Sequence, residues 1–338
     1  MDRRSVQYAG YGNPQAVCTL VRDKISTDVG PGEALVRWLA SPINPLDINK
    51  IQGAYVFKMP LPAIGGSEGV GRVLKVGSGV SNVRAGDQVV TLTFRSPVWA
   101  DASVIEAEGL LKIDSRITPR EGATFMINPP TAWVMIKMGE LEKGDWIIQN
   151  SANSGVGRAV IQIAKEKGLH TINVVRSRPD IDALKADLRS LGGDLVWTEE
   201  EVAKEGKSMK GKVKLALNGV GGRSCLQIAG MLARSGLLVT YGGMSKKPHE
   251  ISTSALVFNE IRAVGVAIGM WMTREENKEE VEVMLKEIQD MYIRKTLYPP
   301  PMDAWPLEDY AKAIANSMDG KHGKQIFVME PEIGGAKI

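Results

Sequence analysis

Two arginines stand directly after a short apolar run that is typical of a buried strand. The run is Asn173-Val174-Val175, and Arg176 and Arg178 follow it closely. Guanidinium groups suit a phosphate dianion, because each can donate two parallel hydrogen bonds to its oxygens. A solvated loop with two exposed arginines would give the same pattern. The choice between these interpretations depends on what precedes the strand.

A turn that contains glycine lies upstream of these arginines. The apolar strand "DWIIQN" (145–150) leads into "SANSGVG", where Gly155 and Gly157 begin a segment with apolar residues at helical spacing. Glycine lets the backbone approach a pyrophosphate, and the free N–H groups of a helix start can bind it. The full GxGxxG pattern is absent, since Ala152 and Ser154 occupy two of its places. Taken alone, the turn fits a purely structural strand-to-helix connection equally well.

The turn and the arginines together favour NADPH. In a Rossmann unit that binds NAD, an acid about twenty residues after the glycine turn usually bonds the ribose 2′-hydroxyl. Arg176 and Arg178 stand in that region instead, and Asp180 follows Pro179, where it is expected to begin the next helix. The sequence therefore predicts that the arginines bind the 2′-phosphate of NADPH.

The elements that would position these residues alternate between strands and helices. From about residue 125, strands at 145–150, 170–175, 213–220 and 237–243 are separated by helical patterns, one of them around 222–234. Repeated units of this kind predict a parallel, doubly wound sheet. A further helix is expected at 274–295, with Thr273 and Glu276 as its capping box.

The first third of the chain has a different pattern. Short β-branched runs at 33–40, 69–80 and 87–94 are separated by Gly, Asn and Pro, which indicates a β-rich region. Near the other end, "LYPPPMDAWP" (297–306) is expected to break the chain before a last helix and the strand "QIFVM". The fold class predicted is α/β, with a β-rich part and a doubly wound part.

Composition excludes several classes of protein. The 338 residues are enough for two domains, and the net charge of +3 gives no reason to expect nucleic acid as a partner. No apolar run reaches the roughly 18 residues that span a bilayer. The two cysteines, Cys18 and Cys225, form no CxxC, so a disulfide framework is not expected and a reducing compartment is favoured.

The chain as a whole resembles the medium-chain dehydrogenase/reductases, and within them the mitochondrial trans-2-enoyl-thioester reductase family. The blocks that carry the resemblance are "SPINPLDINKIQGAY", "GGSEGVGRV", "QNSANSGVGRAVIQIAKEKGL", "TINVVRSRPDI", "LALNGVGG", "LVTYGGMSK" and "KQIFVM". The resemblance implies a GroES-like catalytic domain at residues 1–124 and 299–338. It also implies a Rossmann NADPH-binding domain at residues 125–298.

The activity implied by this resemblance is the NADPH-dependent reduction of trans-2-enoyl thioesters to saturated acyl thioesters in mitochondrial fatty acid synthesis. Hydride would pass to the β-carbon, and Tyr55 in "IQGAYVF" would assist protonation of the α-carbon. Without the resemblance, a tyrosine packed at the rim of a cleft would be the better interpretation. The substrate would be enoyl-CoA or enoyl-acyl-carrier protein. The location would be mitochondrial, although "MDRRSVQYAG" does not read as a targeting segment.

The resemblance also implies a set of cofactor-binding residues. They are Asn128 near the nicotinamide, Asn153, Ser154, Gly155 and Val156 at the pyrophosphate, Arg176, Ser177 and Arg178 at the 2′-phosphate, Tyr241, Gly242, Gly243 and Met244 after a strand, Val266, Ala267 and Ile268 beside the nicotinamide, and Lys324 from the C-terminal return. Lys324 could instead be an exposed charge on a strand. Val266-Ala267-Ile268 replaces bulkier aromatic residues of the family, which could widen an acyl pocket and leaves chain-length preference open.

No metal site is predicted. Zinc-dependent members of the superfamily hold the metal with Cys and His, but "INPLDINK", "GGSEGVG" and "INPPTAW" contain neither. The three histidines, His170, His249 and His322, have no ligand spacing. An enoyl thioester can react without a Lewis acid, because its conjugated carbonyl already makes the β-carbon electrophilic.

The sequence also suggests an oligomeric state and leaves two alternative functions open. The apolar stretch "AVGVAIGMWM" (263–272) reads as an edge strand of the Rossmann sheet, which favours a homodimer that continues the sheet. A quinone or alkenal reductase of the same superfamily would use the same cofactor without depending on Tyr55. A non-catalytic NADPH-binding or interaction protein would bind the cofactor and turn over nothing.

Overall fold

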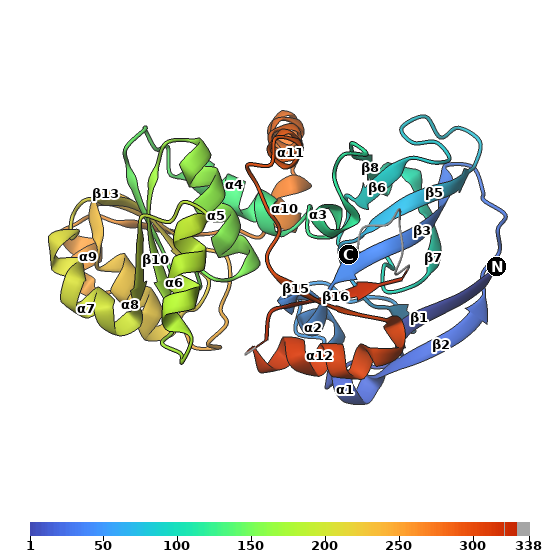
Figure 1. Ribbon diagram of the computed structural model, residues 1–338, viewed down its shortest axis with the longest axis horizontal. Coiled ribbons are helices and arrows are strands. Elements are labelled where there is room, and N and C mark those ends of the chain that lie inside the picture. The colour runs from blue at the N-terminus through green and yellow to red at the C-terminus, as the bar shows by residue number, and fades with distance from the viewer. Residues whose placement is uncertain (321, 330–338) are drawn as a thin grey trace. The chain divides into compact units, whose positions relative to one another are not determined.

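The computed structural model describes residues 1–320 and 322–329 (Figure 1). The chain forms two compact units, and the first combines Met1–Met126 with the C-terminal residues from Pro299 onward. The second unit is Ile127–Tyr298. Among the described residues, no helix is both long and apolar enough to cross a membrane.

The second unit contains the parallel sheet that the sequence predicts; it has six strands, and one of them, Leu195–Thr198, was not among the predicted ones. The strand order is β11-β10-β9-β12-β13-β14. Counted along the chain this order is 3-2-1-4-5-6, that of a dinucleotide-binding Rossmann sheet, with its switch point between β9 and β12. The strands are β9 (Trp146–Gln149), β10 (His170–Val175), β11 (Leu195–Thr198), β12 (Val213–Asn218), β13 (Leu232–Thr240) and β14 (Arg262–Gly265).

Helices cover this sheet because their apolar faces need burial. In the helix after β9, the side chains of Val160, Ile161, Ile163 and Ala164 are buried. The helices are α4 (Asn128–Met138), α5 (Gly155–Glu166), α6 (Ile181–Ser190), α7 (Glu199–Glu205), α8 (Gly222–Ala229), α9 (Thr253–Val257), α10 (Ile268–Met272) and α11 (Lys278–Ile293), with 3₁₀ turns η2 (Gly206–Ser208) and η3 (Glu275–Asn277).

Two helix predictions for this unit are wrong at their ends. The helix expected at 274–295 begins only at Lys278, because Asn277 is its N-cap residue and donates from its side chain to the Trp271 carbonyl. Thr273 forms no capping box and donates to the Met270 carbonyl instead. The helix expected to reach 234 ends at Ala229, since Leu232 already pairs with Val213 of β12.

The first unit is built from two sheets. One has the order β2-β1-β4, and the other has the order β15-β16-β3-β5-β6-β8 with β7 paired to β3. Trp38, Trp99 and Phe327 are fully buried in its core, where the rings of Trp99 and Phe327 meet edge to face. The strands are β1 (Asp2–Tyr8), β2 (Cys18–Lys24), β3 (Glu33–Pro42), β4 (Ala63–Ile64), β5 (Val70–Val76), β6 (Gln88–Thr91), β7 (Ala102–Glu106), β8 (Leu110–Lys112), β15 (Met302–Trp305) and β16 (Lys324–Val328).

Short helices connect these strands. They are α1 (Pro14–Val17), α2 (Pro45–Ile51), α3 (Pro119–Ala123), α12 (Tyr310–Asp319), η1 (Ala107–Gly109) and η4 (Leu307–Asp309). The stretch 297–306, expected only to break the chain, contains β15, which pairs in parallel with β16. The prolines of this stretch precede the strand, and β15 lies at the edge of the sheet. The N–H donors that proline lacks are therefore not needed for the hydrogen bonds between the strands.

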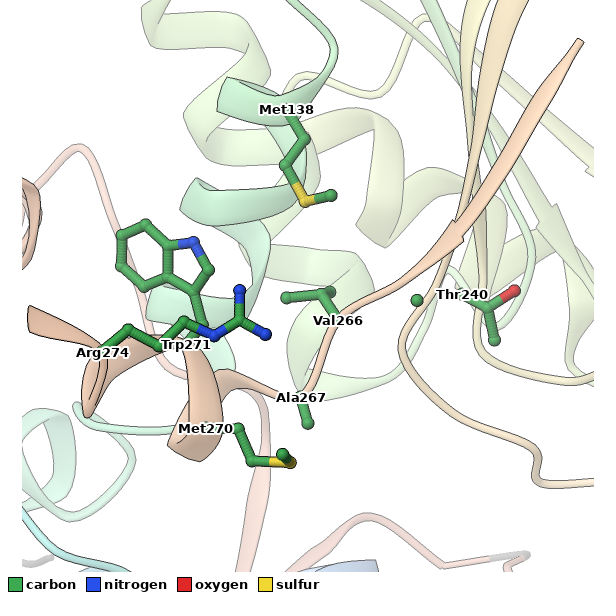
Figure 2. Close-up of a pocket in the computed structure, with 8 residues that line it drawn as sticks. Met138, Thr240, Val266, Ala267, Met270, Trp271 and Arg274 are labelled. Carbon is green, nitrogen blue, oxygen red and sulfur yellow. The ribbon is translucent and has the colours of Figure 1, made fainter. Parts of the chain in front are cut away.

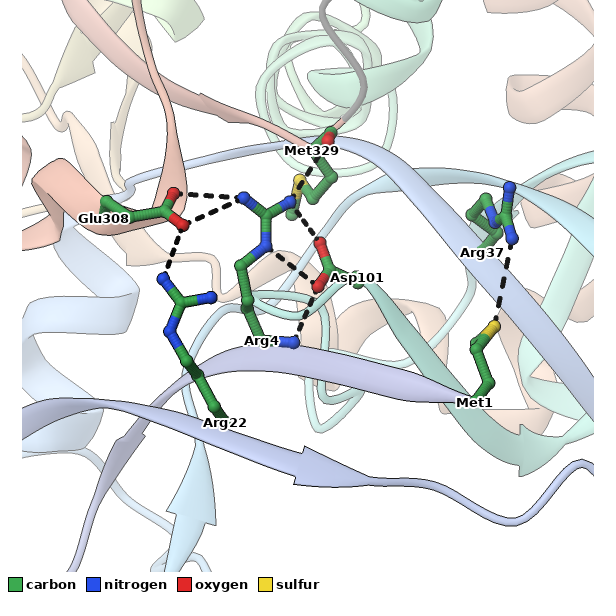
Figure 3. A network of polar contacts seen from close by, with 7 residues as sticks. All are labelled: Met1, Arg4, Arg22, Arg37, Asp101, Glu308 and Met329. Atoms are coloured by element: carbon green, nitrogen blue, oxygen red, sulfur yellow. Dashed lines mark hydrogen bonds and ion pairs between the residues drawn. The ribbon is translucent and has the colours of Figure 1, made fainter.

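An arginine network fastens the C-terminal return to the first strands (Figure 3). Arg4 of β1 donates to Asp101 from its guanidinium group at 2.7 and 3.0 Å and from its backbone N–H at 2.6 Å. The same guanidinium group donates to Glu308 of η4, which also accepts from Arg22 of β2. These ion pairs raise the pKa of Arg4 further above its ordinary value. Glu308 of the C-terminal return is thereby held against a strand that lies about three hundred residues earlier.

Candidate active site and cofactor-binding site

The glycine turn lies at the carboxyl end of β9, at the switch point of the parallel sheet. Ser154 is the N-cap of α5, and its hydroxyl accepts a hydrogen bond from the Gly157 N–H at 3.1 Å. A Cβ at Gly157 would stand 2.5 Å from the Ala152 carbonyl oxygen, so only glycine fits there. Ligands bind at such a position in open α/β sheets, where the start of a helix offers free N–H donors.

Asn128 lies against this turn. It begins α4 and is 7% exposed, and a Cβ at Gly155 would come within 2.8–3.0 Å of its side-chain atoms. The Asn128 Nδ2 is buried and has no hydrogen-bond partner within the described residues. A buried amide donor without a partner costs free energy, so its position fits a ligand that supplies an acceptor.

The two arginines are found at the same edge of the sheet. They follow Val175, the last residue of β10, and the backbone of Ala152 bonds to Val174 of that strand. Arg176 and Ser177 are exposed, whereas Arg178 is half-buried, and its Nε atom is buried without a hydrogen bond to any residue that the structure describes. The structure therefore brings the arginine pair and the glycine turn together, at the carboxyl ends of adjacent strands.

The loop after β13 reaches the glycine turn from the other side of the switch point. The Tyr241 hydroxyl is buried near Ser154, and burial raises the pKa of Tyr241 to about 12. Gly242 is half-buried, while Gly243 and the Met244 side chain are exposed. Tyr241 to Met244 thus lie where the sequence expects them, with only the tyrosine packed inward.

Sequence reasoning missed an asparagine pair that shapes this edge. Asn150 follows β9 and donates to the Asn218 Oδ1 at 2.9 Å, while its own Oδ1 accepts from the Gly219 N–H at 2.8 Å. The Asn218 Oδ1 also accepts from the Gly221 N–H at 3.0 Å, which fixes the turn after β12. The available signal was a polar residue at the end of two otherwise apolar strands, in "WIIQN" and "LALN".

A cavity of about 500 Å³ lies at the carboxyl ends of β13 and β14. Figure 2 shows Met138, Val266, Trp271 and Arg274 around it. Its lining is Met138, Thr240, Gly265, Val266, Ala267, Met270, Trp271 and Arg274. Of the three residues predicted beside the nicotinamide, Val266 and Ala267 line this cavity. Ile268 begins α10 and is buried instead.

Tyr55 lies in the first unit, in the segment between α2 and β4. Its ring is half-buried and meets Phe57 edge to face, with ring centroids 4.9 Å apart. Burial raises the pKa of Tyr55 above its ordinary value of 10.0. The phenol therefore remains protonated at neutral pH, which is the state that a proton donor needs.

Lys324 is not an exposed strand charge. It begins β16, and its ammonium group donates to the side-chain oxygen of Asn44. The Asn44 amide in turn donates to Glu68 at 2.9 Å, and burial raises the pKa of Glu68 to about 7. Burial lowers the pKa of Lys324, although the neighbouring carboxyl groups of Glu68 and Asp47 oppose that change.

No group of three or more His, Cys, Asp and Glu residues lies close enough to hold a metal in the part of the chain that the structure describes. The loop at which a histidine would be needed contains Ser67, whose hydroxyl donates to Asp47. His170 contacts Asp194, and His249 contacts Asn218.

Comparisons with known proteins agree with this geometry. The family model described as alcohol dehydrogenase GroES-like domain matches residues 30–109, and the one described as zinc-binding dehydrogenase matches residues 155–289. The chain is similar to a mitochondrial enoyl-[acyl-carrier-protein] reductase of Caenorhabditis elegans, with 49% identity over 98% of this chain and 97% of the relative. It is 40% identical to the Homo sapiens enzyme of that name, over 93% of this chain and 85% of the relative.

Solved structures of similar proteins have the same fold. The structure of the Etr1p/NADP/crotonyl-CoA complex superposes with a TM-score of 0.89 at 32% identity, covering 97% of this chain and 100% of that one. A Pseudomonas syringae quinone oxidoreductase superposes with a TM-score of 0.82 at 24% identity, covering 96% and 99%, and shows the fold alone. The predicted fold class, a GroES-like part and a Rossmann part, is confirmed. The chain belongs to the mitochondrial enoyl-[acyl-carrier-protein] reductase family.

Proposed function

We propose that this protein reduces trans-2-enoyl thioesters to saturated acyl thioesters in mitochondrial fatty acid synthesis, with NADPH as the reductant. The observation that carries the proposal is identity of 49% over nearly the whole chain with a reductase of this name. The site supports it, because the glycine turn lies at the switch point of the sheet and the arginine pair follows the adjacent strand β10. The curated relatives are named mitochondrial, and we assign the same location to this protein.

The residues of the second unit fit NADPH. We propose that Asn153, Ser154, Gly155 and Val156 bind the pyrophosphate and that Arg176, Ser177 and Arg178 bind the 2′-phosphate. Asn128 offers its unpartnered amide to the cofactor. Tyr241 to Met244 and Val266 to Ile268 complete the proposed set in this unit, and Lys324 of the first unit is proposed as a further cofactor-binding residue. When bound, NADPH supplies the hydride for the β-carbon of the substrate.

Tyr55 is the proposed proton donor. Reduction of the β-carbon leaves negative charge that the thioester carbonyl shares as an enolate, and the α-carbon must then take a proton. A protonated phenol beside that carbon can supply it, and the pKa of Tyr55, which burial raises above its ordinary value of 10.0, leaves the phenol protonated at neutral pH. We accordingly assign catalysis to the domain at residues 1–124 and 299–338, and cofactor binding to the domain at residues 125–298.

The cavity beside β14 is the proposed acyl site. Its lining is mostly apolar, with two methionines that can adapt to chains of different shape. Arg274 and Thr240 are the polar side chains at this cavity. We expect the protein to accept acyl chains longer than the four carbons of crotonyl thioesters.

The experiment that tests this function is NADPH oxidation with a panel of thioesters and quinones. Trans-2-enoyl-CoA substrates from C4 to C16 are offered beside enoyl-acyl-carrier protein, benzoquinones and alkenals. We expect turnover of both kinds of thioester, with rates that depend on acyl length. Turnover of quinones alone would identify a quinone reductase, and cofactor binding without any turnover would identify a non-catalytic protein.

A homodimer is the proposed assembly. Strand β14 is the sheet edge, and Arg262, Ala263, Val264 and Gly265 are all exposed. Leu256, Val257, Phe258 and Met270 expose further apolar surface on the adjoining segments. An open apolar edge is usually paired or covered, and a second copy of the same strand can pair with it. A structure of a related protein is an Etr1p/Etr2p heterodimer from Candida tropicalis, so pairing with a different chain is the competing outcome.

The dimer proposal predicts the effect of a charge on this edge. Val264→Lys places an ammonium group on the exposed strand and is expected to convert the dimer to monomer. Val283→Lys, at an exposed valine on α11, is the control and should stay dimeric. Sedimentation equilibrium measures the mass directly. A wild-type protein that sediments at the mass of a single chain would refute the homodimer.

The donor set also predicts the metal content. The described residues offer no cluster of His, Cys, Asp and Glu, so the purified protein is expected to contain no stoichiometric zinc. Activity should persist after dialysis against a chelator. Elemental analysis that finds one zinc per chain, together with loss of activity on its removal, would contradict this expectation.

A further inference from the structure

The ring of Tyr55 is held by a phenylalanine rather than by regular secondary structure. Tyr55 lies in a segment that has neither helix nor strand, and Phe57 meets its ring at an interplanar angle of 86°. Such an edge-to-face pair fixes the relative orientation of two rings. The position of the tyrosine therefore depends on what holds Phe57.

Arg95 also contacts the ring of Phe57. The guanidinium carbon of Arg95 lies 4.6 Å from the centroid of the Phe57 ring, within the range of a cation–π contact. Arg95 comes from the turn after β6, about forty residues later in the sequence. A guanidinium group over an aromatic face is attracted to the ring by its charge, which an aliphatic side chain would not be.

A buried ammonium group fixes the turn that carries Arg95. Lys50, at the end of α2, is 4% exposed and donates to the Phe94 carbonyl at 2.8 Å. It also donates to the Gly66 carbonyl at 2.7 Å and to the Ser67 hydroxyl at 3.1 Å. All three N–H donors of the ammonium group thus have acceptors, which a buried charge requires. Lys50 joins the helix before Tyr55 to the turn that carries Arg95.

From these contacts we infer that Arg95 is a positioning residue for the proposed reduction: it clamps Phe57, and Phe57 holds the Tyr55 ring in place for proton transfer. The inference rests on the proposed function and extends it to two residues outside the proposed catalytic and cofactor-binding set. Precise placement matters because a displacement of about 1 Å can cost a reaction about 10²-fold. Lys50 holds the turn that carries Arg95 in place. Because Lys50 is buried, replacing it would also disturb the fold, so it is not used in the test.

The test is a kinetic double-mutant cycle on the full-length protein with crotonyl-CoA. Arg95→Ala is expected to lower kcat about three- to tenfold, with the KM for NADPH unchanged. Phe57→Leu should lower kcat at least as much, whereas Phe57→Tyr keeps the ring and should lose less. In a Tyr55→Phe background, Arg95→Ala should cause no further loss, because it acts through the missing hydroxyl.

Lys312→Ala is the matched control, because Lys312 makes a similar exposed contact with Trp305 in the same unit. Its kcat is expected to equal that of the wild type. Full kcat in Arg95→Ala would overturn this inference and leave the proposed function standing. The same holds if the fold-losses in kcat of Arg95→Ala and Tyr55→Phe multiply in the double variant. A wild-type protein that reduces no enoyl thioester would remove the proposed function and this inference with it.

Discussion

Tyr55→Phe is expected to lower kcat for enoyl thioesters by about 10²–10⁴-fold, the usual contribution of general acid catalysis. The substitution removes one oxygen and keeps the ring that contacts Phe57. The KM for the thioester should change much less than kcat, because the hydroxyl acts mainly in the transition state. Steady-state rates of NADPH oxidation with crotonyl-CoA measure the effect.

The control for this prediction is Tyr298→Phe, at a half-exposed tyrosine of the second unit whose backbone, not its ring, bonds to Gln162. That variant should keep wild-type kcat. The wild-type rate should also fall at alkaline pH, where the Tyr55 phenol loses its proton. Because burial raises the pKa of Tyr55, this fall should lie above the ordinary value of 10.0. Near wild-type kcat in Tyr55→Phe would show that the tyrosine only lines the site and that another group protonates the α-carbon.

Joint replacement of Arg176 and Arg178 by Ala is expected to raise the KM for NADPH by about 10²-fold or more. Each arginine offers charge-assisted hydrogen bonds worth about 1.5–3 kcal/mol to a phosphate, and solvent screening reduces this for the exposed Arg176. Arg178→Ala alone should therefore cost more than Arg176→Ala alone. Use of NADH, which has no 2′-phosphate, should be nearly unchanged. Cofactor titrations at fixed crotonyl-CoA measure both constants.

Arg189→Ala supplies the control for general loss of positive charge. Arg189 is an exposed arginine near the end of α6, away from the carboxyl ends of the strands. Its KM for NADPH should match that of the wild type. Equal losses of NADPH and NADH use in the double variant would contradict the assignment of the arginines to the 2′-phosphate.

The parallel sheet was predictable because its signals are local. Strands β9, β10, β12 and β13 each contain a short apolar run, and α5 shows its buried face at helical spacing within a dozen residues. The late start of α11 was not predictable, because it depends on a bond from Asn277 to a carbonyl on the preceding helix. Strand β15 was missed because its partner strand lies some twenty residues further on, and only that pairing makes it a strand.

The residues of the candidate site also differ in whether local sequence signals could predict them. Gly155 and the arginines could be proposed from spacing within one Rossmann unit. Tyr55 could not, since only resemblance to a family singled it out from other tyrosines. The bonds between Asn150 and Asn218 and between Lys324 and Asn44 join residues 68 and 280 positions apart, which no local pattern reveals. The assignments of the individual site residues stay predictions until the variants are measured.

Isotope tracing tests the central claim most directly. NADPH carrying deuterium at both C4 positions is mixed with crotonyl-CoA and the wild-type protein in H₂O, and the product is examined by NMR. We predict butyryl-CoA with one deuterium at the β-carbon, and, with unlabelled NADPH in D₂O, one deuterium at the α-carbon. Saturated product without deuterium from NADPH at the β-carbon, or no saturated product at all, would contradict the proposed reaction.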